Sequence, residues 1–196
     1  MRGHAPLVHE ARKIPWKFVI SGALLALSCL ALRAIPELFV VTHRHPLTSE
    51  AKVNLRAAFS AERAFFANSG RSSETIEHMQ FFPEHGNRYL SVVSTSGDLL
   101  EGAPDGRFHT GVSADLTRFP LADTQRLLSG IPPDLMREVG VRCPRDEECE
   151  VTIVAAGNID EDETIDVWSV STKTRTIGEY GIPPGVPFNH VIDEDP

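Results

Sequence analysis

Side chains that carry oxygen ligands alternate along one short acidic segment of the chain. They are Asn158, Asp160, Asp162, Thr164 and Asp166. Because they fall at every second position, one loop could wrap a hard cation such as calcium, which takes oxygen ligands in proteins. An EF-hand loop would instead have glycine at Glu163 and a bidentate glutamate at Ser169. The segment therefore predicts either a structural calcium site or an acidic turn whose Asn and Asp side chains cap backbone amides, and the turn is the favoured interpretation.

Cys143 and Cys149 flank a short polar segment, PRDEE. A pair at this spacing suits a disulfide, which would close a small loop before a strand and stabilise the fold by about 2 kcal/mol in an oxidising compartment. A metal site would need more ligands, and no CxxC motif is present. Cys29 lies in an apolar segment, where acylation as in a lipoprotein is an alternative that the preceding residues disfavour.

The sequence has no recognisable catalytic motif. It lacks Gly-x-Ser-x-Gly, HExxH and a glycine-rich phosphate loop, so we expect no catalytic residues and no enzyme activity. His43 and His45 form an HxH pair that could bind a metal, but beside a membrane they are better explained as polar residues facing lipid headgroups. Trp168 and Tyr89 could contact a sugar, although strand positions favour the core.

Charge is distributed unevenly along this chain, whose net charge is −8. The first 17 residues are basic, whereas the segment from Arg145 to Pro196 is strongly acidic. Such an acidic segment would repel phosphates, which argues against nucleic-acid binding.

An apolar stretch over residues 18–41 is long enough to span a bilayer. Trp16 and Lys17 precede it as an interfacial aromatic residue and a cytoplasmic cation would, so residues 1–17 are expected inside. Arg33 and Glu37 suit an interfacial ion pair. We expect a single-pass membrane protein in contact with lipid, with residues 47–196 outside the cytosol. A cleaved signal peptide is the alternative.

The elements that would position these residues form one α+β domain. An amphipathic helix is predicted over 47–69, with Leu55, Phe59 and Phe66 on its apolar face, Val53 beside them and Glu62 on the polar side. A sheet-containing head is predicted over 88–196, with a short helix before it at 74–82. Within the head we expect an irregular 98–120, two short helices in 121–138 and a strand at 174–177. The proline-rich tail is expected to be a surface loop.

The β-branched segments 149–156 and 165–172, separated by the acidic loop, predict an antiparallel hairpin. Three strings in this order resemble type IV pilins, especially those of myxobacterial and related deltaproteobacterial lineages. They are SEAKVNLRAAFSAERAFFAN, FFPEHGNRYL and AAGNIDEDETIDVWSVST. The resemblance implies a long N-terminal helix, half in the membrane or fibre core, with its second half packed on a small antiparallel sheet. It also implies that pilus or secretion-system subunits bind through the N-terminal helix. The location that it implies is a bacterial inner membrane, with residues 47–196 periplasmic or extracellular.

The start of the apolar segment departs from the pilin pattern. It has no Gly-Phe junction, and the turn Val19-Ile20-Ser21-Gly22 lacks the carboxylate that pairs with a neighbouring subunit's N-terminus in that family. We therefore expect a membrane-anchored structural or accessory protein of a type IV pilus or a type II secretion-like system. The alternative is a membrane-tethered periplasmic module that captures calcium or a cationic partner without polymerising.

Overall fold

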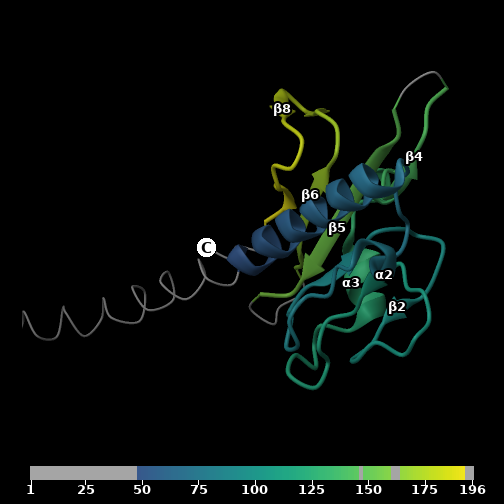
Figure 1. The fold of residues 1–196 in the computed structure, drawn as a ribbon. Helices are drawn as coiled ribbons and strands as arrows, with labels where there is room; N and C mark the ends of the chain where they lie inside the picture. The colour runs from purple at the N-terminus through teal and green to yellow at the C-terminus, as the bar shows by residue number, and fades with distance from the viewer. Residues whose placement is uncertain (1–47, 146–147, 160–163, 193–196) are drawn as a thin grey trace, which may run out of the picture. The chain divides into compact units, whose positions relative to one another are not determined.

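A computed structural model describes residues 48–145, 148–159 and 164–192 of the chain. A helix covers 48–69 and ends at Gly70, whose φ of +69° is the left-handed conformation that commonly terminates helices. Figure 1 shows this helix lying across the strands of the head. The predicted helix and its stop are thus confirmed, whereas the predicted segments 1–17 and 18–41 lie outside the described residues.

The face that the helix buries differs from the predicted one. Ala51, Leu55, Ala58 and Glu62 have almost no exposed surface, and their spacing places them on one side of the helix. Val53, predicted beside the apolar face, is 61% exposed. The prediction for Glu62 was also wrong, because this carboxylate is buried and accepts hydrogen bonds from the backbone amide of Ser73, which follows the helix. Two alanines on the buried side let the helix lie close to the sheet.

The central strands of the sheet are β5 (Glu150–Gly157) and β6 (Asp166–Ser171). They pair antiparallel from Thr152↔Ser171 to Gly157↔Asp166, which confirms the predicted hairpin. Both strands are buried almost throughout, as their continuous β-branched and small side chains require. β4 (Gly140–Arg142) pairs with one end of β5, and β1 (Leu90–Val92) pairs with the other.

Within the described residues, the sheet has seven strands in the order β2-β3-β1-β5-β6-β9, with β4 on β5. The segment 98–120 was predicted to be irregular but contains β2 (Leu99–Leu100) and β3 (Gly111–Val112), which pair parallel. The sheet is therefore mixed, although most of its pairs are antiparallel. The tail was predicted to be a surface loop, yet β9 (Phe188–Val191) pairs with β6 at the sheet edge.

Helices cover both faces of the sheet. The helix 48–69 and the short α2 (Ile76–Met79) contribute to one core, together with Ile153 and Trp168. On the other face, α3 (Thr124–Gly130) and α4 (Pro133–Met136) contribute Leu127 and Leu135 to a second core. The break between α3 and α4 falls where the paired prolines were predicted to interrupt the helix.

Strand β7 (Arg175–Ile177) lies where a further strand was predicted, but it pairs with β8 (Tyr180–Ile182) and not with the main sheet. This β7–β8 hairpin leaves the sheet after β6 and returns through Gly185 to β9. Figure 1 shows it projecting from the head.

Candidate functional site

The acidic loop that suggested calcium binding is described only at its two ends. Asn158 is buried at the end of β5, Thr164 precedes β6, and Asp166 is the first residue of β6. Asp160 and Asp162 lie outside the described residues. Among the residues that the structure describes, no three His, Cys, Asp or Glu side chains gather as a metal site would require. The calcium hypothesis therefore stays a prediction.

Asp166 is a buried carboxylate whose hydrogen bonds come from three neighbours. Its Oδ2 accepts hydrogen bonds from the Tyr89 hydroxyl, at 2.6 Å, and from the Trp168 indole N–H. The amide of Asn189 donates to its Oδ1 at 2.9 Å. Burial and the nearby Asp166 charge raise the pKa of Tyr89, which keeps the phenol protonated as a donor. Both carboxylate oxygens of Asp166 thus have hydrogen-bond partners within the head.

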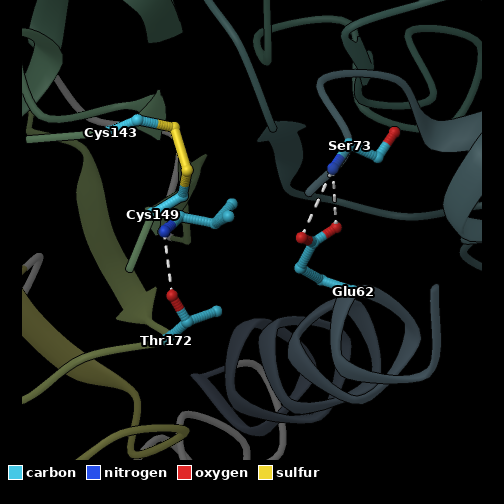
Figure 2. Close-up of a disulfide and its surroundings, with 6 residues drawn as sticks. Glu62, Ser73, Cys143, Cys149 and Thr172 are labelled. Atoms are coloured by element: carbon cyan, nitrogen blue, oxygen red, sulfur yellow. Dashed lines mark hydrogen bonds between the residues drawn. A yellow bond between two sulfur atoms is a disulfide. The ribbon is translucent and has the colours of Figure 1, made fainter. Parts of the chain in front are cut away.

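Two glutamates fix the helix 48–69 to the chain segment that follows it. Glu50 Oε1 accepts hydrogen bonds from the backbone amides of Arg88, at 2.7 Å, and Tyr89, at 3.4 Å. Glu62 accepts from the Ser73 amide at 3.3 and 3.2 Å, as Figure 2 shows. Burial raises the pKa of Glu62 above its usual value. These contacts hold both ends of the described helix in register with the head.

The disulfide between Cys143 and Cys149 is present, as the spacing predicted (Figure 2). The two residues follow and precede the paired residues Arg142 and Glu150, so the bond closes the β4–β5 hairpin. The Thr172 hydroxyl accepts a hydrogen bond from the amide of Val151 at 2.8 Å and ties the end of β6 to the same strand. This corner of the head is thus fixed covalently and by hydrogen bonds.

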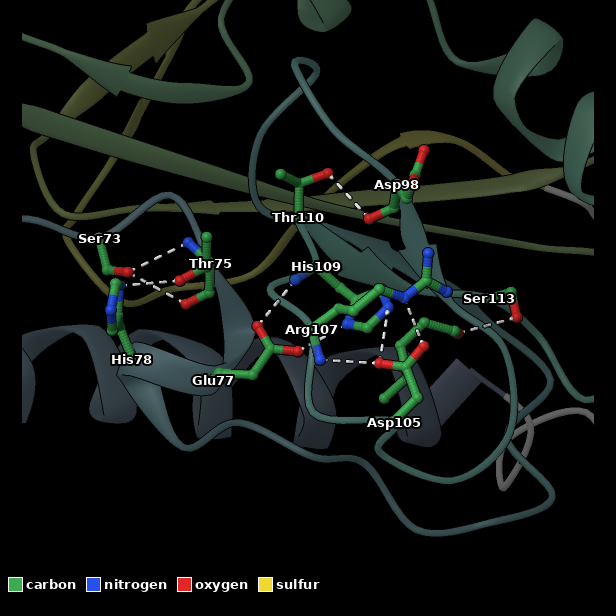
Figure 3. Close-up of polar contacts among 11 residues, drawn as sticks. Ser73, Thr75, Glu77, His78, Asp98, Asp105, Arg107, His109, Thr110 and Ser113 are labelled. Atoms are coloured by element: carbon green, nitrogen blue, oxygen red, sulfur yellow. Dashed lines mark hydrogen bonds and ion pairs between the residues drawn. The ribbon is translucent and has the colours of Figure 1, made fainter.

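His109 is buried between two carboxylates, a cluster that the scattered histidines of the sequence did not reveal. Its Nδ1 is 2.7 Å from Glu77 Oε1, and its Nε2 is 3.5 Å from Asp105 Oδ1 (Figure 3). The His109 amide also donates to Glu77 Oε2 at 2.8 Å. Burial acts to raise the pKa of Glu77, but the hydrogen bonds from His109 lower it below the usual value. The cluster attaches the loop before β3 to α2.

Ser169 and His190 have the spacing of a nucleophile and a base, with Oγ and Nε2 2.6 Å apart. Ser169 has no exposed surface, however, and Arg175 Nη2 donates to the same Oγ at 2.8 Å. Burial and the Arg175 cation lower the pKa of His190 to about 4, so the ring is neutral at neutral pH. Because substrate has no access to Ser169, we interpret this contact as structural.

The outward side of the helix 48–69 carries exposed small and basic side chains. They are Val53, Arg56, Ala57, Ser60, Arg63, Ala64 and Ala67. A helical face of this kind admits close approach by another protein surface and offers no group for chemistry. No helix among the described residues is both long and apolar enough to cross a membrane.

Comparisons with known proteins identify similar sequences. A family model described as type IV pilin PilA matches residues 44–166, which is more than half of the chain. The type IV major pilin protein PilA of Myxococcus xanthus (strain DK1622) is 29% identical over an alignment of 185 residues, which covers 82% of each chain. The family match includes the described helix, strands β1 to β5 and the first residue of β6.

Proposed function

Because the chain belongs to the type IV pilin PilA family, we propose that it is a structural subunit of a type IV pilus, assembled from a form anchored in the bacterial inner membrane. The observation that carries this proposal is the family match over residues 44–166, which joins the helix and most of the sheet in one unit. Pilins are structural proteins, and the chain is not an enzyme.

The packing of the helix 48–69 supports a role in assembly. Its inner side is buried on the sheet, and Glu50 and Glu62 fix its position, so its outer side stays exposed for contacts with other subunits. The apolar residues 18–41 precede it and suit a membrane-spanning continuation. In this arrangement the N-terminal helix binds pilus subunits while the head forms the surface.

The likeness to a major pilin over 82% of each chain favours entry into the fibre. The missing carboxylate in the turn Val19–Gly22 favours an accessory position at the membrane, in a pilus or a type II secretion-like system. We place the fibre role first, because the likeness covers 82% of each chain and the missing carboxylate concerns one short segment. No specific observation favours a tethered calcium-binding module, since Asp166 is occupied by internal partners.

Cell fractionation tests the proposal. Surface fibres are sheared from cells that carry the native gene, and fibre and membrane fractions are probed with an antibody against the head. Mass spectrometry of the N-terminal peptide from each fraction shows whether the chain is processed. The account predicts the chain in both fractions. A chain found only in membranes, with an intact N-terminus, would instead support the accessory role, and a chain in neither fraction would contradict both.

A further inference from the structure

His109 lies between two carboxylates, and each of its ring nitrogens faces one of them. Nδ1 is 2.7 Å from Glu77 Oε1 on α2, and Nε2 is 3.5 Å from Asp105 Oδ1 in the loop before β3 (Figure 3). The His109 side chain is 2% exposed, whereas that of Asp105 is 37% exposed. The histidine ring is therefore shielded from water, and one of its two carboxylate partners belongs to an exposed loop.

The geometry favours a ring with a proton on both nitrogens. An ionised carboxylate can only accept hydrogen bonds, so Nδ1 donates its proton to Glu77. In a neutral ring Nε2 would then point a lone pair at Asp105, whereas in the imidazolium it carries a second proton. Two carboxylates in contact with the ring compensate the charge of a buried cation.

Both carboxylates are in the ionised form that this arrangement needs. Hydrogen bonds from the amide and guanidinium of Arg107 lower the pKa of Asp105 below its usual value. For Glu77, burial acts to raise the pKa, but the hydrogen bonds from His109 lower it overall. Each carboxylate therefore keeps its negative charge at neutral pH and in mild acid.

The second proton of the ring matters on the side of the loop. On the α2 side, the backbone holds His109, because its amide donates to Glu77 Oε2 at 2.8 Å and its carbonyl accepts from the Ile76 amide at 3.0 Å. A neutral ring with its proton on Nδ1 keeps the contact with Glu77 as well. The ion pair between Nε2 and Asp105, in contrast, exists only while the ring is charged. Loss of the proton frees the loop at Asp105 and leaves His109 attached to α2.

The other charged groups around the ring are mostly acidic. A groove of about 540 Å³ lies between this loop and α3, and its charged lining residues are Asp98, Glu101, Asp105, Arg107 and His109. The lining residues from α3 are uncharged, namely Thr124, Gln125 and Leu128. On α2, His78 Nδ1 is 2.9 Å from the Thr75 hydroxyl. Among the described residues of the groove, deprotonation of His109 leaves Arg107 as the cation facing three carboxylates, so repulsion then favours displacement of the loop.

We propose that His109 is a pH-sensitive latch, which in its protonated form fastens the loop 101–107 to α2 through Asp105 and releases it as the pH rises. The direction follows from the proton itself, which is bound on the acidic side and lost on the alkaline side. The loop is therefore most ordered at the lower pH. This inference concerns the head alone and does not depend on entry of the chain into a fibre.

NMR of the full-length chain in detergent tests the charge of the ring. Histidine is labelled with ¹⁵N, and the signals of His109 are those that vanish in His109→Gln. The two nitrogens of an imidazolium give signals at similar frequencies, whereas those of a neutral ring are widely separated. His109 should keep its second proton to a higher pH than the exposed His85, which is observed in the same samples. Loss of the proton at the same pH as His85, or at a lower one, would overturn the latch.

Relaxation of the ¹⁵N backbone signals tests the release of the loop. From about pH 6 to about pH 9, the order parameters of residues 102–107 should fall from about 0.85, typical of rigid backbone, to below about 0.6. Asp105→Asn removes the charge that faces Nε2, so the loop should be mobile at both pH values and His109 should lose its proton at a lower pH than in the wild type. Asp134→Asn is the matched control, since this side chain is 89% exposed, and it should behave as the wild type.

These measurements separate a latch from a contact with a purely structural role. Equal loop order parameters at both pH values overturn the proposal even if the ring titrates, and so does an equal response of Asp105→Asn and Asp134→Asn. If His109→Gln does not fold, the comparison of these two aspartate variants still decides the release. Failure of the latch leaves the pilus role intact, because neither measurement involves fibre entry.

Discussion

Buried polar side chains of this head obtain their hydrogen-bond partners from segments that are distant in sequence. Asp166 receives hydrogen bonds from β9, from its own strand and from Tyr89, which immediately precedes β1. His190 on β9 and Arg175 on β7 both contact Ser169 on β6. An unpartnered buried polar group costs about 1–3 kcal/mol, so each contact selects one register of the strands. Individual residues thus help to specify how the sheet is assembled.

Asp166→Asn should destabilise the head by about 1–3 kcal/mol, because the amide group replaces one acceptor and the negative charge is lost. Urea unfolding of the wild-type and variant chains measures this difference. Asp134→Asn is the matched control, since its side chain is 89% exposed. An Asp166→Asn loss no greater than that of the control would contradict the role given to the buried carboxylate.

The pKa of His190, lowered to about 4 from 6.5, makes stability depend on pH. Between these pH values the unfolded chain binds a proton on His190 that the folded chain does not, so the wild type loses stability as the pH falls from 6.5 to about 4. His190→Gln lacks this titration. As the pH falls from 6.5 to about 4, the stability of the variant minus that of the wild type should therefore increase. A difference between the two chains that is independent of pH would show that the ring is not buried in its neutral form.

At the scale of elements, the close packing of the helix 48–69 on the sheet depends on small side chains. Ala51 and Ala58 have no exposed surface, whereas the neighbouring Ala57 is exposed. The disulfide closes the β4–β5 hairpin. The helix is therefore positioned by the small size of its buried side chains, and the β4–β5 hairpin by a covalent bond.

Ala58→Leu should lower the free energy of unfolding by about 1–3 kcal/mol, because a larger side chain overpacks the contact between the helix and the sheet. Ala57→Leu adds the same atoms on the exposed side and should change stability little. Thermal unfolding of both variants gives the comparison, and equal losses would show that the helix does not rest on the sheet at Ala58.

Replacing Cys143 and Cys149 together by alanine should lower the unfolding free energy by about 2 kcal/mol, since a short loop in the unfolded chain is no longer closed. Reduction of the wild-type chain should give a similar loss, and reductant should not affect the double variant. If reductant destabilised the double variant as much as the wild type, the effect would not arise from this disulfide.

The elements that the sequence predicted well have local causes. The β5–β6 hairpin has two long β-branched runs, the break between α3 and α4 has paired prolines, and the disulfide has a short spacing. β2, β3, β8 and β9 are two to four residues long and gave no periodic pattern. The burial of Glu62 depends on the Ser73 amide, and the Ser169–His190 contact depends on the pairing of β6 with β9. Long-range pairing of this kind cannot be predicted from the local composition of either segment.

At the scale of the whole molecule, the described head has helices on both faces of one mixed sheet, a projecting hairpin near one edge and a groove at the other. The outer side of the helix 48–69 is exposed. Together with the family match, these features indicate a structural subunit that acts through contacts with other proteins.

Immunogold electron microscopy of intact cells tests the central claim most directly, with an antibody raised against residues 48–192. The account predicts gold particles along filaments that extend from the cell surface, without permeabilisation. The account would be contradicted if the filaments stayed unlabelled and the antibody reached the chain only after permeabilisation, in the same place as a cytosolic marker.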